Sequence, residues 1–360
     1  MSPAGIPTAD LDDEASAGEA IRAGFSEYGL VHVRNHGVDA AELSRLYDAY
    51  SEICARPESE KQKLGGAEIW YQRGWTPPNT EQAVVATGQP DFKECYFAAP
   101  LPTDPDQKLQ YPQIHADNVW PEGAPAFREA YLAVGRQLHE AGVRLLRAAA
   151  RALGLEPGVF ERGTEGGPHV LRLLRYLPLT SEQVGTPIVW GEEHTDFNLV
   201  TLLPGGRFHD PDGKPSQPPD SSSGLYLRTR GNEKVRGVAP PGCIVAQVGQ
   251  ALEILTGGTF LATPHVITAP STPGYSRLSC AHFVHLHSHQ MLFPLPEFRS
   301  DETILAYSPP VLAGTYGIKT LVDIHLAPQS ALDRLGYRHY DRLATLRSHE
   351  RANSSSGPIS

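Results

Sequence analysis

A histidine and an aspartate stand one residue apart in an otherwise apolar run, EEHTDFNLVTLL, at residues 192–203. Side chains two positions apart in a β-strand leave the same face, so a strand here would point His194 and Asp196 together toward the interior. A buried imidazole and carboxylate need a partner that offsets the free-energy cost of burial. That partner is either a hydrogen bond between the two side chains, which is the commoner arrangement, or a divalent metal ion that both bind.

A third candidate ligand favours the metal. His265 follows the turn-rich stretch GGTFLATP and begins HVITAP, where we expect another strand. Two histidines and one carboxylate leave three open positions on a six-coordinate ion, the arrangement typical of non-haem Fe(II) oxygenases. A 2-oxo acid would take two of these positions and dioxygen the third. The carboxylate of Asp196 argues against a halide-binding variant, which would lack it.

An arginine and a serine follow on the next predicted strand, YSRLSCAHFVH, where Arg277 and Ser279 share one face. A guanidinium beside a hydroxyl matches a carboxylate, and an inward arginine on an apolar strand requires an anion. We therefore expect this pair to hold a carboxylate; the alternative is that Arg277 lies in solvent at a sheet edge. Upstream, LRLLRYLP carries Arg172 and Tyr176 on one face of another strand, as further polar groups for the 2-oxo acid or the substrate.

Short β-rich stretches separated by Gly, Pro and Asn turns position these residues, and such spacing predicts a jelly roll. The stretches are HVLRLLRYLPL, HTDFNLVTLLP, GLYLRTRG, GCIVAQVG, ALEILTGG, PHVITAP and SRLSCAHFVHLH. Helical periods precede them at 14–24, 39–57 and 126–155, and GIKTLVDIHL and ALDRLGYRHYDRLATLRSH are helix candidates after them. We expect an α+β fold: a double-stranded β-helix (jelly roll) core flanked by N-terminal and C-terminal helices.

The chain is expected to form one structural unit with four parts. These are a mainly helical region at 1–165, the jelly-roll core at 166–290, a helical cover at 291–350 and a disordered tail at 351–360. Within the core, residues 205–224 are rich in Pro, Gly, Ser and Asp. This composition predicts a long surface loop or lid.

Composition narrows the class of partner and the compartment. The 360 residues carry a formal net charge of -10, which argues against a general nucleic-acid or anionic-membrane surface and leaves a small molecule as the expected partner. Four cysteines without CxxC spacing are expected to be reduced thiols. With no signal peptide and no apolar window of roughly 18 residues, we expect a cytoplasmic protein. The sequence indicates no oligomeric state.

Together these motifs resemble the isopenicillin N synthase-like family of Fe(II)/2-oxoglutarate dioxygenases over most of the chain. The matching stretches are YGLVHVRNHGV, ARPESEKQKL, RYLP, HTDFNLVTLL, GQALEILTGGTFLATPHVI and RLSCAHFVH. The resemblance implies three iron ligands, an anchor of two residues for the distal carboxylate of 2-oxoglutarate, and one further contact to a carboxylate. In that order these are His194, Asp196 and His265, then Arg277 and Ser279, then Tyr176.

The resemblance also implies an activity. 2-Oxoglutarate and dioxygen would give succinate and carbon dioxide while a small molecule is hydroxylated, desaturated or cyclised. An alternative keeps the iron but not 2-oxoglutarate, as in the oxidase members of the family.

Within the family, TGQPDFKECYF and GGTFLATPH most resemble the bacterial branch that includes ethylene-forming enzyme. That enzyme holds its arginine co-substrate with an acidic residue upstream of PDF. An ungapped count puts Val84 there, and Glu81 fits only with a longer loop. Ethylene formation is therefore not expected.

Four residues are candidates for the substrate pocket, each with an alternative structural role in the core or at the surface. Phe283 shares strand parity with the carboxylate-binding pair, and Phe197 follows the predicted aspartate ligand directly. Arg172 is the third. Trp70 lies on IWYQRGWTPPNTEQAVVATGQPDFKECYF, an aromatic stretch without helical period that predicts a covering element.

A rival metal site would use three later histidines. His285, His287 and His289 alternate in HFVHLHSH and would share one strand face. Because no carboxylate or cysteine stands beside them, we expect an exposed run.

Overall fold

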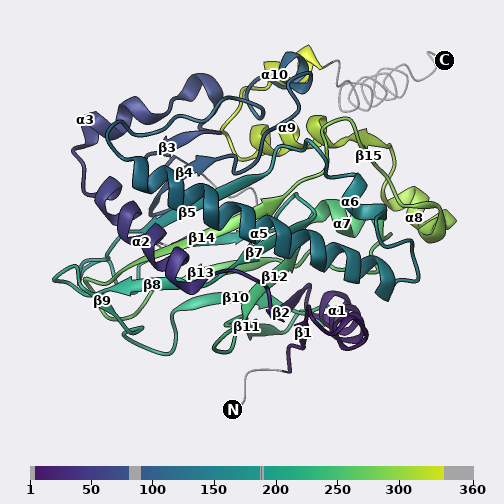
Figure 1. The fold of residues 1–360 in the computed structure, drawn as a ribbon, viewed down its shortest axis with the longest axis horizontal. Helices are drawn as coiled ribbons and strands as arrows, with labels where there is room; N and C mark the ends of the chain where they lie inside the picture. The colour runs from purple at the N-terminus through teal and green to yellow at the C-terminus, as the bar shows by residue number, and fades with distance from the viewer. Residues whose placement is uncertain (1–4, 81–90, 187, 189, 336–360) are drawn as a thin grey trace, which may run out of the picture.

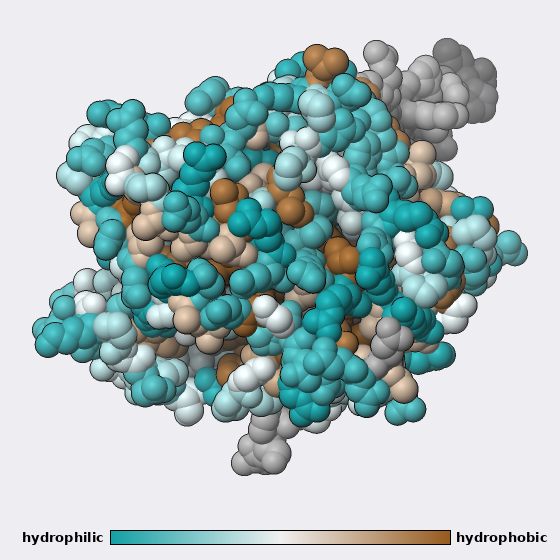
Figure 2. Space-filling model, in the orientation of Figure 1, coloured by the Kyte–Doolittle hydropathy of each residue, from teal (hydrophilic) through white to brown (hydrophobic). Residues whose placement is uncertain are grey.

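Two β-sheets pack against each other, and helices cover the outer face of the larger one (Figure 1). The computed structural model describes residues 5–80, 91–186, 188 and 190–335. The face in Figure 2 is mostly hydrophilic, with hydrophobic patches scattered over it. Apolar side chains are gathered inside, and the largest cluster lies between the main sheet and its helices.

The main sheet has ten strands in the order β1-β2-β12-β7-β14-β5-β4-β3, with β8 paired to β14 and β9 to β8. Its strands are β1 Thr8–Asp10, β2 Leu30–Arg34, β3 Gly74–Thr76, β4 Lys93–Ala98, β5 Val170–Tyr176, β7 Val200–Leu203, β8 Gly206–His209, β9 Pro215–Ser216, β12 Ile244–Val248 and β14 Ser276–Val284. The second sheet, β11-β10-β13-β6, comprises β6 Gly191–His194, β10 Gly224–Arg228, β11 Lys234–Arg236 and β13 His265–Thr268. Strands β15 Met291–Leu292 and β16 Val311–Leu312 form a separate pair.

Helix α5, Pro125–Ala152, lies across the main sheet and contacts β5, β7 and β14 (Figure 1). Gly142 allows this close approach, since a Cβ there would come within 2.8 Å of a Val284 methyl group. The other α-helices are α1 Glu14–Glu27, α2 Ala40–Cys54, α3 Glu58–Lys61, α4 Gln107–Gln110, α6 Val159–Arg162, α7 Gln250–Leu255, α8 Asp301–Ala306, α9 Ala313–Asp323 and α10 Ser330–Arg334; 3-10 turns are η1 Gln62–Leu64, η2 Ala67–Ile69 and η3 Pro296–Phe298.

The predicted α+β jelly roll with flanking helices is confirmed. Helices α1, α2, α5 and α9 occur where helical periods indicated them. Helix α10 begins the last helix candidate. The rest of that candidate, the tail at 351–360, and Val84 and Glu81 lie outside the described residues. No helix within the described ranges is long and apolar enough to cross a membrane.

Four element predictions are wrong in whole or in part. ALEILTGG was predicted as a strand but contains most of helix α7. The prediction failed because a short apolar run does not distinguish a strand from a helix. HTDFNLVTLL is no single strand: β6 ends at His194 and β7 begins at Val200. The loop predicted at 205–224 contains β8 and β9, and β8 pairs with β14. The aromatic covering stretch supplies β3 and β4, which pair with each other and, through β4, with β5 in the main sheet.

Candidate active site

Three side chains converge where β6, the turn after it and β13 meet. His194 and His265 are paired across β6 and β13, and their ring centroids lie 4.3 Å apart. The Nε2 atoms of His194 and His265 lie 3.7 and 4.0 Å from Oδ1 of Asp196. One possible ligand atom from each of the three residues lies within 4.8 Å of the other two. In the described part of the chain, no other group of three His, Cys, Asp or Glu residues is close enough to hold a metal ion.

Hydrogen bonds leave Nε2 of both histidines available. Nδ1 of His194 donates to the Glu192 carbonyl at 2.7 Å. Nδ1 of His265 lies 2.5 Å from the side-chain nitrogen of Gln247, whose buried Oε1 has no partner. Turning the side-chain amide of Gln247 by half a turn lets Oε1 accept a hydrogen bond from Nδ1–H. Both rings then carry their proton on Nδ1 and face Asp196 with an Nε2 lone pair, as metal ligation requires.

The turn at 195–199 is fixed by the start of helix α7. The backbone N–H groups of Gly249 and Gln250 donate to the carbonyls of Leu199 and Asp196 at 2.8 and 2.7 Å. On the side chain, Oγ1 of Thr201 donates to Oδ2 of Asp196 at 2.6 Å, which leaves Oδ1 facing the histidines.

Electrostatics favour the protonation states of a metal site. Burial alone would raise the pKa of the Asp196 carboxyl, but His265, His194 and Thr201 outweigh it and hold that pKa below its usual value. Burial, together with His194, lowers the pKa of His265 to about 4. A carboxylate and two neutral imidazoles give the N, N, O donor set that suits Fe(II).

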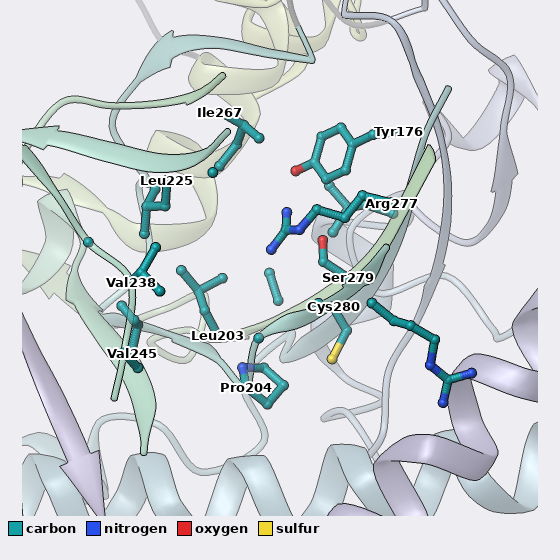
Figure 3. Close-up of a pocket in the computed structure, with 18 of the residues that line it drawn as sticks. Tyr176, Leu203, Pro204, Leu225, Val238, Val245, Ile267, Arg277, Ser279 and Cys280 are labelled. Carbon is teal, nitrogen blue, oxygen red and sulfur yellow. The ribbon is translucent and has the colours of Figure 1, made fainter. Parts of the chain in front are cut away.

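A guanidinium stands at the other end of the same cavity. The guanidinium carbon of Arg277, on β14, lies 5.6 Å from the ring centroid of Tyr176 and 5.9 Å from that of Phe208. Among the described residues, no carboxylate forms an ion pair with Arg277. Figure 3 shows its guanidinium beside the hydroxyls of Ser279 and Tyr176. A Cβ on Gly206 would lie 2.7 Å from two guanidinium nitrogens, so the glycine leaves room for the arginine. Three donors facing one space match a carboxylate.

Two cavities meet at the triad. The barrel cavity, about 620 Å³, lies between the sheets and is lined by Arg277, Ser279, Tyr176 and His265. The cover cavity, about 390 Å³, lies beneath α9. Their shared lining residues are Lys93, Arg172, His194, Asp196 and Phe283. A ligand in either cavity therefore reaches the space beside the candidate ligands.

Comparison with known proteins agrees with this geometry. Residues 6–123 match the family described as non-haem dioxygenase in morphine synthesis N-terminal, and residues 168–286 match the 2OG-Fe(II) oxygenase superfamily, 2OG being 2-oxoglutarate. The chain belongs to the 2OG-Fe(II) oxygenase superfamily. Oxygenases of this superfamily use Fe(II), 2-oxoglutarate and dioxygen, as the motifs implied.

Relatives and solved structures cover most of this oxygenase. Jasmonate-induced oxygenase 4 of Arabidopsis thaliana is 25% identical over 84% of this chain and 79% of its own. A homoarginine-6-hydroxylase of Oryza sativa subsp. japonica is 27% identical over 77% of this chain and 79% of its own. The structure of a 2OG-Fe(II) oxygenase family protein from Caulobacter crescentus superposes with a TM-score of 0.74 at 26% identity, covering 90% of this chain and 100% of that one.

Three of the four predicted substrate residues of the oxygenase line the cover cavity. Phe197, Phe283 and Arg172 do so, and the Arg172 guanidinium carbon lies 4.9 Å from the Phe97 ring. Trp70 lines neither cavity. It is buried in a separate cluster beneath α9 and α10, away from both cavities, and we do not include it in the proposed substrate site.

The predicted exposed run of histidines is wrong for two of its members. His285 follows the end of β14, lines the cover cavity and lies 5.1 Å from the Phe197 ring. Burial lowers its pKa to about 3. His287 is half-buried with Nε2 3.0 Å from an Asp104 oxygen, and only His289 is exposed.

Sequence reasoning missed four residues that shape the site: Gln247, Thr201, Gly206 and Lys93. A glutamine in the apolar strand GCIVAQVG and a lysine before the apolar part of KECYFA were visible signals of buried polar groups. Thr201 was hidden because the turn after His194 was taken for strand. Gly206 was hidden because its strand was taken for loop.

Proposed function

We propose that this oxygenase hydroxylates a small organic molecule bound in the cover cavity. His194, Asp196 and His265 would bind Fe(II), and Arg277, Ser279 and Tyr176 would anchor 2-oxoglutarate in the barrel cavity. The observation that carries the proposal is the meeting of two cavities at the triad, with an arginine that has no carboxylate partner among the described residues in one of them. Each cavity then has one occupant.

Bound iron, 2-oxoglutarate and dioxygen would together supply the oxidant: one oxygen atom of dioxygen would end in succinate as carbon dioxide is released, and the other in the hydroxyl group formed at a substrate C–H bond. The protein's own groups bind and orient. Arg277 neutralises the distal carboxylate, and Thr201 and Gln247 hold two ligands in their binding orientation. Leu203 and Leu225 give the barrel cavity apolar walls beside Arg277 (Figure 3).

The cover cavity supports a substrate that is small and partly aromatic or aliphatic with polar ends. Phe97, Phe197 and Tyr316 offer ring faces, and Arg172 and Lys319 add charged groups. The name of the Oryza sativa relative, homoarginine-6-hydroxylase, supports hydroxylation of a molecule of this size. Desaturation and ring closure would use the same bound groups.

A reducing compartment, the cytoplasm, is also proposed. Cys54, Cys95, Cys243 and Cys280 all carry free thiols. The net charge of -10 supports a small-molecule partner over nucleic acid.

Succinate release from 2-oxoglutarate tests the function. The Fe(II)-loaded enzyme is incubated with candidate small molecules in air, and succinate is quantified with and without each one. We expect substrate-stimulated succinate in the unsubstituted enzyme and in His289→Ala, whose histidine lies on the surface, and none in His265→Ala. Full substrate-stimulated succinate release by His265→Ala would refute the proposal.

A further inference from the structure

The barrel cavity continues beyond Arg277 to the surface, on its own side of the molecule. Its lining runs from the triad past Arg277 to Val238, which is 46% exposed, and to the exposed residues Gln217 and Pro240. These residues come from the loop after β11 and the segment after β9. We call the opening they border, together with the start of α2, the barrel mouth.

The cover cavity reaches different segments. Its outer lining comes from α9 and the residues after it, including Thr320 and Ile324. None of Val238, Gln217 and Pro240 lines it, and the two cavities share lining residues only around the triad. A molecule entering through the barrel mouth therefore meets Arg277 without crossing the substrate's space.

The groups along this path suit a dicarboxylate. Arg236 lines the barrel cavity, donates Nη2 to the Ser223 carbonyl at 2.9 Å and has a buried Nε without a hydrogen-bond partner. No carboxylate of the described chain forms an ion pair with it. Between the mouth and Arg277 the walls are apolar: Val238, Val245, Leu225 and Leu203 face Arg277 in Figure 3. Low-dielectric walls between two cations draw an anion inward.

We propose that the barrel mouth is the entrance for 2-oxoglutarate and the exit for succinate, separate from the substrate's entrance through the cover cavity. The proposal rests on the function proposed above. It means that 2-oxoglutarate has a path to Arg277 that a substrate in the cover cavity does not block.

Stopped-flow binding of 2-oxoglutarate to the anaerobic Fe(II) protein, followed by the visible absorbance of the chelate, tests the route. The variants are Val238→Trp, Gln217→Trp and the double variant, which narrow the mouth, and Thr320→Trp, which places the same bulk in the cover cavity. A narrowed path slows entry and exit equally. We expect both rate constants to fall by about fivefold or more in the double variant while Kd stays within about twofold, and neither to change in Thr320→Trp.

Unchanged rates in the double variant, or slowing in Thr320→Trp instead, would overturn the separate entrance while leaving the oxygenase function intact. No chelate absorbance in the unsubstituted protein would overturn both. If the double variant raises the Kd for 2-oxoglutarate by a larger factor than it lowers the two rate constants, the mouth residues contact bound 2-oxoglutarate. That result would also contradict a role in passage alone.

The charge of the mouth has its own test in Arg236→Gln. Steering predicts a slower association rate constant with a weaker dependence on salt, and an unchanged dissociation rate constant. An association rate that keeps its full salt dependence would remove Arg236 from the path.

Discussion

The two cavities differ in how they are built. The polar groups of the barrel cavity come mainly from paired strands: β14 brings Arg277 and Ser279 opposite Tyr176 and Leu174 of β5 in fixed register. The cover cavity combines residues of the paired strands β4, β5 and β14 with the turn at 195–198, α7 and α9, which lie far apart in sequence. Under the proposed function, iron and 2-oxoglutarate would lie where backbone hydrogen bonds between strands fix each position, and the substrate would also contact a turn and helices outside the sheet.

Arg277→Gln gives the largest expected effect and tests the barrel side of this comparison. Removing the charge leaves a carboxylate buried without its cation, which costs about 3 kcal/mol and raises the Kd for 2-oxoglutarate roughly a hundredfold. The measurement is anaerobic titration of the Fe(II) protein. Arg207→Gln, at the rim and already paired with Asp48, is the matched control and should change little. Equal losses in both variants would mean that Arg277 is no anchor.

Acid should lower the free energy of unfolding by protonating a buried histidine between α5 and the main sheet. His139 of α5 faces His282 of β14, with Nδ1 and Nε2 3.3 Å apart, and burial lowers the pKa of His139 to about 4. The unfolded chain binds this proton near pH 6.5 and the folded chain only near pH 4. The stabilisation is therefore complete above pH 6.5 and is lost as the pH falls toward 4.

Urea unfolding at pH 7 and pH 5 measures this loss. Between these pH values the unsubstituted protein should lose about 2 kcal/mol more of its free energy of unfolding than His139→Gln, which has no such proton to bind. An equal loss in both proteins would show that His139 is not the group that titrates.

Thr201→Val removes the hydrogen bond to Asp196 while preserving side-chain shape. We expect the Kd for Fe(II) to rise about tenfold, because the carboxylate loses the contact that orients it. Metal titration under anaerobic conditions measures it. The exposed Thr186→Val serves as control. Unchanged iron affinity would mean that the turn alone orients Asp196.

The smallest effects are expected from single substitutions in the wall of each cavity, which compare the two cavities directly. Phe97 lines only the cover cavity and Leu225 only the barrel cavity. Phe97→Leu should leave the Kd for 2-oxoglutarate within about twofold and change the KM of whichever substrate stimulates succinate release, since separate sites act independently. Leu225→Ala should do the reverse. Crossed effects would show that the cavities are not separate binding sites.

The sequence predicted the barrel cavity better than the cover cavity. The placement of His265, Arg277 and Ser279 on strands that line one cavity could be predicted, because a two-residue period, short turns and buried charge give local signals. Asp196 lies beside the two histidines as expected, but on a turn that hydrogen bonds to the start of α7 hold in place, not on the predicted strand.

The cover cavity shows where local signals end. Trp70 was assigned to it because it lies on an aromatic stretch, yet packing with Tyr111 and Ile318 buries it elsewhere. Tyr316 was not assigned a role and His285 was expected in an exposed run, because their positions depend on how α9 crosses the barrel end, a long-range contact with no local pattern. A local two-residue period predicts which strand residues face the cavity, whereas no local pattern predicts how a helix packs over an open barrel end.

The most direct test of the two-cavity site is an anaerobic crystal structure with Fe(II) and 2-oxoglutarate. We predict iron bound by His194, Asp196 and His265, with the distal carboxylate of 2-oxoglutarate at Arg277, Ser279 and Tyr176 and the cover cavity left open. 2-Oxoglutarate in the cover cavity, or iron bound without these three ligands, would contradict it.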